Sequence, residues 1–99
     1  MLYMIIGRDS DDSLAQRAEA RERHLARLHQ LRDEGRLLTA GPLPAIDSEE
    51  PGPAGFLGSL VVAEFDDLAQ ARTWADADPY IESGAWEDAE VVPYKAVLP

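Results

Sequence analysis

The chain has 99 residues, the size of one domain, and we expect residues 1–99 to form a single domain. Its net charge of −10 argues against nucleic acid and anionic membrane surfaces as partners, because both are bound through clustered cations. The absence of cysteine excludes thiol nucleophiles, disulfides and thiolate metal sites.

The N-terminal third predicts a strand followed by a long helix. Residues 2–7 are apolar on both alternating faces, which is typical of a strand that is covered on both sides. Ser13 and Gln16 have the spacing of a capping box, so a helix should begin there. Leucine and alanine then recur along one broad stripe, and Gly35 suits the end of the helix.

The middle of the chain predicts two strands separated by a loop. Residues 36–42 indicate a short strand that is closed by Gly41 and Pro42. Residues 43–55 are acidic, rich in proline and without periodicity, and they form a loop long enough for a lid or a partner contact. Residues 56–65 predict another strand that is apolar on both faces.

The C-terminal third predicts a second helix and a last strand. Asp67 begins a second capping pattern, and the helix should run to about Ala77. Pro79 should stop it, because the residue before a proline is pushed out of the helical conformation. Residues 88–98 predict the last strand, and Pro93 within it indicates an edge of the sheet or a bulge.

This order of elements favours an α+β fold of the ferredoxin-like βαββαβ type. In this fold a four-stranded antiparallel sheet carries two helices on one face. Three of the predicted strands are nevertheless apolar on both faces. The second face should therefore be covered by something apolar, and a second copy of the chain is the simplest candidate.

Two polar residues interrupt the apolar stripe of the first helix. At 100° per residue, Arg21 falls within roughly 10° of the direction of the stripe, and His24 lies about 70° to one side. An unpaired buried charge is costly, so Arg21 needs a salt bridge that anchors the helix or an anionic ligand. A single hydrogen bond within the fold would satisfy His24, and His29 is interpreted as a surface residue.

Asp78 is a candidate partner for His24. Aspartate is common before proline and at helix ends, where its side chain can accept bonds from nearby backbone amides. An acid is however unfavourable at the C-terminus of a helix, which favours a specific partner. Asp76 is an equally acidic neighbour and serves as a control.

Four further residues could line a cavity. Ser59 shares one strand face with small apolar residues, and Tyr80 follows the Asp-Pro turn. The alternatives are a hydroxyl bonded to backbone for Ser59 and a packing ring for Tyr80. Gly41 and Pro42 form a turn in which the glycine would also let a ligand approach the backbone.

Several signatures are missing from the sequence. It contains no glycine-rich phosphate loop, no metal-ligand spacing of histidines and no nucleophile elbow, so we expect neither a metal nor a cofactor. The first residues lack the cationic start and long apolar core of a signal peptide, and no stretch reaches the length of a membrane span. A cytoplasmic location is therefore expected.

The chain resembles the YCII-related family along essentially its whole length. The resemblance is carried by the segment RAEARERHLARLHQLRDEGRLLTAGP at residues 17–42, by residues 55–88 and by the closing VVPYKAV. It implies a ferredoxin-like fold that pairs through its sheet as a dimeric α/β barrel. It also implies a cleft with a His-Asp pair, which corresponds to His24 and Asp78.

The superfamily resembles muconolactone isomerase, and one branch of the family is similar to a dehydrochlorinase of chlorinated hydroxyhydroquinones. We therefore expect a lyase or isomerase in which His24 moves a proton and Asp78 orients its ring. The expected substrate contacts are Arg21, Ser59, Tyr80, Gly41 and Pro42. The alternatives are a non-catalytic ligand-binding or regulatory module, and a scaffold that binds partners through residues 43–55. The expected assembly is a homodimer or a higher oligomer.

Overall fold

The computed structural model describes residues 1–99 and contains one four-stranded antiparallel sheet, in the order β2-β3-β1-β4. Its strands are β1 (Leu2–Asp9), β2 (Leu37–Pro44), β3 (Phe56–Glu64) and β4 (Trp86–Tyr94). The helices are α1 (Leu14–Asp33), α2 (Leu68–Asp76) and α3 (Pro79–Glu82), with a 3₁₀ turn at Gly52–Ala54. The predicted ferredoxin-like α+β fold is confirmed.

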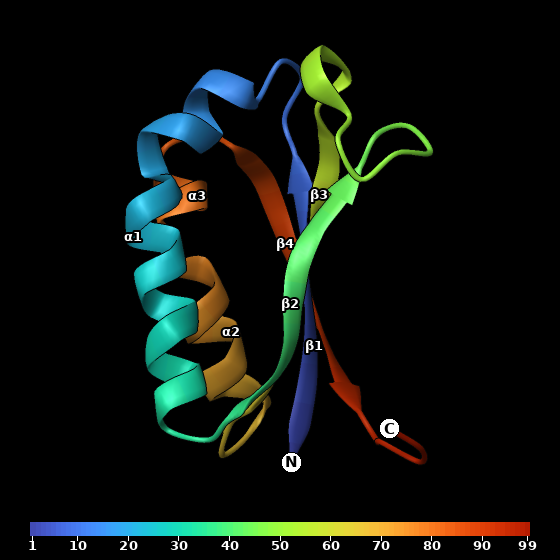
Figure 1. Ribbon diagram of the computed structural model, residues 1–99. Coiled ribbons are helices and arrows are strands. Elements are labelled where there is room, and N and C mark those ends of the chain that lie inside the picture. The colour runs from blue at the N-terminus through green and yellow to red at the C-terminus, as the bar shows by residue number, and fades with distance from the viewer.

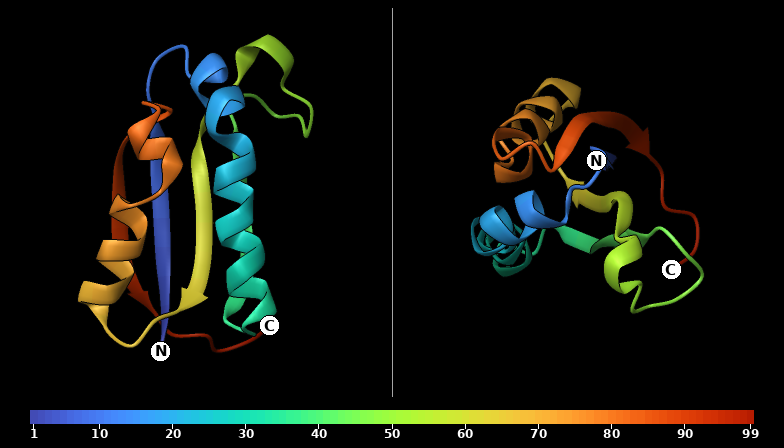
Figure 2. Two further views of the ribbon diagram at one scale, coloured as in Figure 1. Left: turned by 90° about the vertical axis from the view of Figure 1, so that its left-hand side faces the viewer. Right: turned by 90° about the horizontal axis from the view of Figure 1, so that it is seen from above.

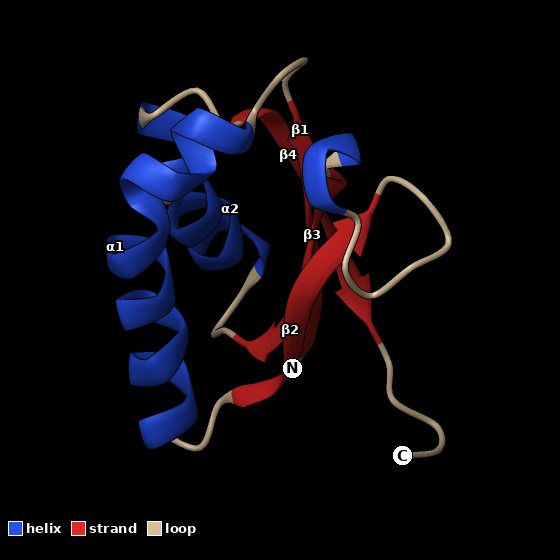
Figure 3. Cartoon of the chain, turned by 45° about the horizontal axis from the view of Figure 1, so that its top comes forward, coloured by secondary structure: helices blue, strands red, loops and turns tan.

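The helices form a second layer on one face of the sheet (Figure 1). Seen from the helix side, α1 runs alongside α2 and α3, and the strands lie behind them (Figure 2). The loop between β2 and β3 projects away from the helices, on the other side of the sheet (Figure 3). No helix combines the length and the apolar character that a membrane crossing requires.

The main differences from the predicted elements follow from strand pairing. The last strand begins at Trp86, two residues before the predicted start, and ends at Tyr94, which pairs with Leu2, the first residue of its antiparallel partner β1. The turn predicted at Gly41 and Pro42 is wrong, because both residues pair with β3 inside β2. This strand continues to Pro44, which shortens the predicted loop. The sequence also did not predict α3, a four-residue helix after Asp78.

Of the four predicted helix ends, two are confirmed by hydrogen bonds or backbone conformation, and α2 ends at Asp76, beside the predicted Ala77. Gly35 adopts a φ of +73°, which favours glycine, just after the end of α1. The Asp67 side chain accepts a bond of 2.8 Å from the backbone N–H of Gln70. The capping box at Ser13 is wrong: its hydroxyl makes no capping bond and donates to the carboxylate of Asp9. That carboxylate is almost fully buried and needs donors, so the Ser13 hydroxyl donates to it instead of accepting from a backbone N–H at the start of α1.

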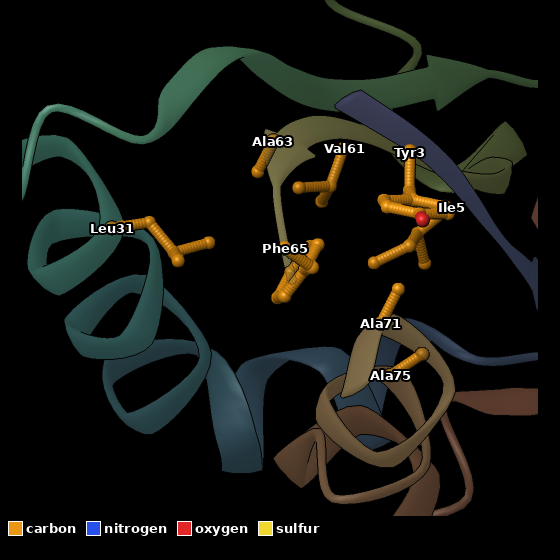
Figure 4. Packing of buried hydrophobic residues seen from close by; sticks show 8 residues of the cluster. All are labelled: Tyr3, Ile5, Leu31, Val61, Ala63, Phe65, Ala71 and Ala75. Atoms are coloured by element: carbon orange, nitrogen blue, oxygen red, sulfur yellow. The ribbon is translucent and has the colours of Figure 1, made fainter. Parts of the chain in front are cut away.

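The main hydrophobic core lies between the sheet and the helices. Its eight buried members come from β1, α1, β3, the residue after β3, and α2, and Figure 4 shows them pointing toward one another: Tyr3, Ile5, Leu31, Val61, Ala63, Phe65, Ala71 and Ala75. Ser59 faces the same layer, since it alternates with Val61 and Ala63 along β3. One face of the sheet is thereby covered.

The predicted inward direction of Arg21 is wrong, because this side chain is exposed. The buried residues of α1 are Arg17, Ala20, His24 and Leu31, whose spacing of three, four and seven defines the covered face. The prediction used the mean direction of the apolar stripe, which falls near Leu14, and Leu14 is itself 40% exposed. The inward arginine is Arg17, one turn earlier.

The opposite face of the sheet carries a row of apolar side chains without a helix over them. Met4, Ile6, Leu60 and Val62 alternate with the core residues of β1 and β3, so they point away from the helices. All but Val62 are only half-buried. The expectation of strands that are apolar on both faces therefore holds for the two central strands.

Candidate functional site

A cavity of about 420 Å³ lies between α1 and the sheet. Nine of its fifteen lining residues are apolar, and none is an aspartate or glutamate. It brings together six residues that the sequence singled out: Arg21, His24, Gly41, Pro42, Ser59 and Tyr80. The seventh, Asp78, does not line the cavity.

His24 and Asp78 are hydrogen-bonded to each other. The Nδ1 atom of His24 lies 2.9 Å from Oδ1 and 3.0 Å from Oδ2 of Asp78. The His24 side chain is 7% exposed and that of Asp78 is 0% exposed, so the carboxylate lies behind the imidazole as seen from the cavity. Nε2 of His24 makes no hydrogen bond within the chain. The geometry fits the predicted pairing, while the catalytic role stays a prediction.

Asp78 is held in place by the start of α3 and by Arg27. Its Oδ1 accepts a bond of 2.9 Å from the backbone N–H of Tyr80. Asp78 is therefore the N-cap of α3, and it also lies just after the end of α2. Its Oδ2 lies 3.3 Å from Nη1 of Arg27. The control residue Asp76 instead forms an exposed pair with Arg72 and does not reach His24. Asp78 is therefore the carboxylate that faces the histidine.

The imidazole ring is fixed by two aromatic neighbours. Tyr80 stacks on it with ring centroids 4.0 Å apart, and Trp86 meets it edge-on at 5.6 Å. The Trp86 ring in turn lies over Gly7, where the Cβ of any other residue would come within 2.1 Å of the indole. Only glycine at position 7 leaves room for this ring.

Arg17 is the site residue that the sequence analysis missed. Its guanidinium forms bonds of 2.6 and 2.9 Å with the carboxylate of Asp9, and it also donates to the Gly58 carbonyl and, at 2.8 Å, to Ser59 Oγ. The Ser59 hydroxyl thus accepts a bond from a charged side chain. Arg17 lies seven residues before His24, which puts both on one face of α1, and this spacing was the available signal.

Burial raises the pKa of the Tyr80 hydroxyl, and the cations Arg17 and Arg21 act against that rise. A raised pKa keeps the hydroxyl protonated at neutral pH, so it can donate a hydrogen bond. Burial also lowers the pKa of Arg27, while its ion pair with Asp78 counters this shift. Arginine nevertheless stays charged in proteins, so Asp78 has a permanent cation beside it.

The polar side chains at the cavity are the imidazole of His24, two hydroxyl groups and two guanidinium groups. The hydroxyls belong to Ser59 and Tyr80, and the guanidinium groups to Arg17 and Arg21. No group of three or more histidine, aspartate or glutamate side chains converges anywhere in the chain in a way that could hold a metal ion. The side chains at the cavity can transfer a proton through His24, donate hydrogen bonds through Tyr80 and attract an anion through Arg21.

The fold and the site define a class of small ferredoxin-like chains with a buried His-Asp pair beside an apolar cavity. Within this class, the chain belongs to the YCII-related domain family, whose model matches residues 1–95. It is 58% identical over 98 residues to the protein YciI of Escherichia coli O6:H1, covering 99% of this chain and 100% of that protein. An uncharacterized protein of Haemophilus influenzae is 53% identical, with the same coverage.

The solved structures include a similar fold with a known reaction. The 5-chloro-2-hydroxyhydroquinone dehydrochlorinase of Burkholderia phenoliruptrix, in complex with 2,5-dihydroxybenzoquinone, superimposes with a TM-score of 0.81. The match covers 96% of this chain and 94% of the other, at 23% sequence identity. This likeness supports the fold.

Proposed function

We propose that the protein is a lyase or isomerase of small molecules, in which His24 transfers a proton to and from a bound substrate. One observation carries the proposal: His24 borders the cavity while its Nδ1 is held by the fully buried carboxylate of Asp78. An ionised carboxylate can only accept hydrogen bonds, so in the neutral ring Nδ1 carries the proton and Nε2 has a free lone pair.

The proposed step begins when Nε2 of His24 takes a proton from a carbon or hydroxyl of the substrate. The electron pair left behind forms a new double bond. In a lyase, a leaving group such as chloride then departs with the electron pair of its bond to carbon, and His24 releases the proton to solvent. In an isomerase, His24 returns the proton at a different carbon. Tyr80 would donate a hydrogen bond to the oxygen that gains negative charge.

The dehydrochlorinase of similar fold acts on a chlorinated hydroxyhydroquinone, and it suggests which compounds to test. Chlorinated hydroxyhydroquinones and small ring lactones would be screened for chloride release and for changes in ring absorbance. For any compound turned over, we expect His24→Asn and Asp78→Asn to lower kcat by about 10²–10⁴-fold, which is typical of a positioned acid–base group.

Asp76→Asn is the matched control for this experiment, because it makes the same chemical change two residues away on an exposed aspartate. It should leave kcat unchanged. Full turnover by His24→Asn would contradict the proposed mechanism. A large loss in Asp76→Asn would show that the effect is not specific to the pair.

A non-catalytic ligand-binding module is the second candidate. The observation that favours it is that Asp78 also binds Arg27 and the Tyr80 amide, as a purely structural carboxylate would. In that case Asp78→Asn should cost about 3–5 kcal/mol of stability, as the loss of a buried pair does. A catalytic pair is expected to cost less, because active sites are rarely optimised for stability.

We also propose that the chain forms a homodimer through the face of the sheet that no helix covers. The support is the apolar row at Met4, Ile6, Leu60 and Val62. Ile6→Lys should convert the dimer to a monomer in sedimentation velocity, because it places a charge in the middle of the row. Val97→Lys, in the exposed C-terminal segment, is the control. A wild-type chain that sediments as a monomer would contradict the proposal.

A further inference from the structure

Arg21 is unlike the other arginines of the chain because it has no carboxylate partner. The chain has 19 acidic residues, and every other arginine pairs with at least one of them. The paired arginines are Arg8, Arg17, Arg23, Arg27, Arg32, Arg36 and Arg72. In so acidic a chain, a cation without a partner at a cavity points to an anion that comes from outside.

The position of Arg21 makes its charge available to the cavity. It borders the cavity one turn before His24, and no carboxylate borders the cavity with it. The charge of Arg17 is already matched by Asp9, and that of Arg27 by Asp78. Arg21 therefore leaves the cavity with an excess positive charge, although the chain as a whole carries −10.

The electrostatic effect of Arg21 extends to the aromatic side of the cavity. It is one of the two cations that oppose the rise in the Tyr80 pKa, the other being Arg17. An anionic oxygen on a ligand near Tyr80 would thus lie within the field of Arg21. It could also accept a hydrogen bond from the Tyr80 hydroxyl.

The size and lining of the cavity restrict the rest of the ligand. An apolar cavity of about 150 Å³ is sufficient for benzene, so about 420 Å³ accommodates one ring with several substituents. Most of the lining is apolar, and Phe56 and Leu28 are among the side chains that a ring would contact.

We propose that the ligand of this cavity is a single-ring anion whose carboxylate or ionised hydroxyl lies at Arg21 while its ring fills the apolar part. This inference rests on the proposed function, since it names the substrate class of the same site. The anionic oxygen would lie next to the base, His24, which is one turn further along α1.

Isothermal titration calorimetry with benzoate and benzamide tests the inference, because the two probes share one shape and differ in charge. Wild-type protein should bind benzoate at least about tenfold more tightly than benzamide, since hydrogen bonds to charged groups are the stronger ones. Arg21→Gln should weaken benzoate binding by about three- to tenfold and leave benzamide binding unchanged. Arg23→Gln, an exposed change of the same kind on the same helix, should alter neither.

Equal affinities of the wild-type protein for the two probes would overturn the inference, as would equal effects of Arg21→Gln and Arg23→Gln. Failure of both probes to bind at millimolar concentration would overturn it as well. His24→Asn separates this inference from the proposed function. If benzoate binding depends on Arg21 while His24→Asn turns over substrate normally, the anion site stands and the acid–base mechanism falls.

Discussion

Replacing Arg17 with alanine is expected to lower the free energy of unfolding by about 3–5 kcal/mol. The substitution leaves the carboxylate of Asp9, which is 2% exposed, without its charge partner. It also removes the donor to the Gly58 carbonyl, which ties α1 to β3. Small domains have only about 5–15 kcal/mol of stability in total, so the variant should lose a large share of it.

Urea denaturation followed by circular dichroism measures this loss. Arg23→Ala is the control, because Arg23 forms an exposed pair with Glu19 on the same helix and such pairs contribute about 0–1 kcal/mol. The double variant Asp9→Leu/Arg17→Met should recover much of the stability, since it removes both buried charges together. Equal losses in Arg17→Ala and Arg23→Ala would show that the Arg17–Asp9 pair does not anchor the helix.

Replacing Gly58 with alanine is the second change with a large expected effect. A Cβ at this position would lie 2.0 Å from the backbone carbonyl oxygen of Gly7 on the neighbouring strand. A backbone atom within a paired strand cannot rotate away as a side chain can, so β1 and β3 would have to separate locally. We expect a loss above the about 1–3 kcal/mol that is typical of overpacked cores.

Gly41→Ala is the matched control for Gly58→Ala. Gly41 lies in the adjacent strand β2, and a Cβ there meets no atom within 4 Å. Thermal unfolding should show a clearly lower Tm for Gly58→Ala and little change for Gly41→Ala. Similar melting temperatures for the two variants would mean that the strands can adjust to the added methyl group.

The fold was largely predictable because its signals are local. Alternating and helical apolar patterns located four strands and two helices, and Gly35 and Asp67 marked helix ends through their own backbone preferences. The capping box at Ser13 failed because a buried carboxylate from another element took its hydroxyl. Asp9 lies only four residues before Ser13, but its burial, which makes it take this hydroxyl as a donor, is visible only in the folded chain.

The site was predictable in part for the same reason. An acid before Pro79 and a histidine at the edge of an apolar stripe are visible in the sequence, and their hydrogen bond is present in the structure. The sequence analysis chose Arg21 as the inward arginine, whereas the structure buries Arg17. A stripe direction averaged over leucines cannot distinguish two arginines that lie one turn apart. Burial of Arg17 depends on Asp9 in β1, which only the folded chain brings near.

The proton position on His24 tests the central claim most directly. Multiple-bond ¹H–¹⁵N NMR of the histidine side chains would be recorded at a pH where the ring is neutral. We predict that Nδ1 of His24 carries the proton and Nε2 is bare, in the wild type and in Asp76→Asn alike, because the Asp78 carboxylate must receive a donor. A proton on Nε2, with a bare Nδ1 facing Asp78, would contradict the account.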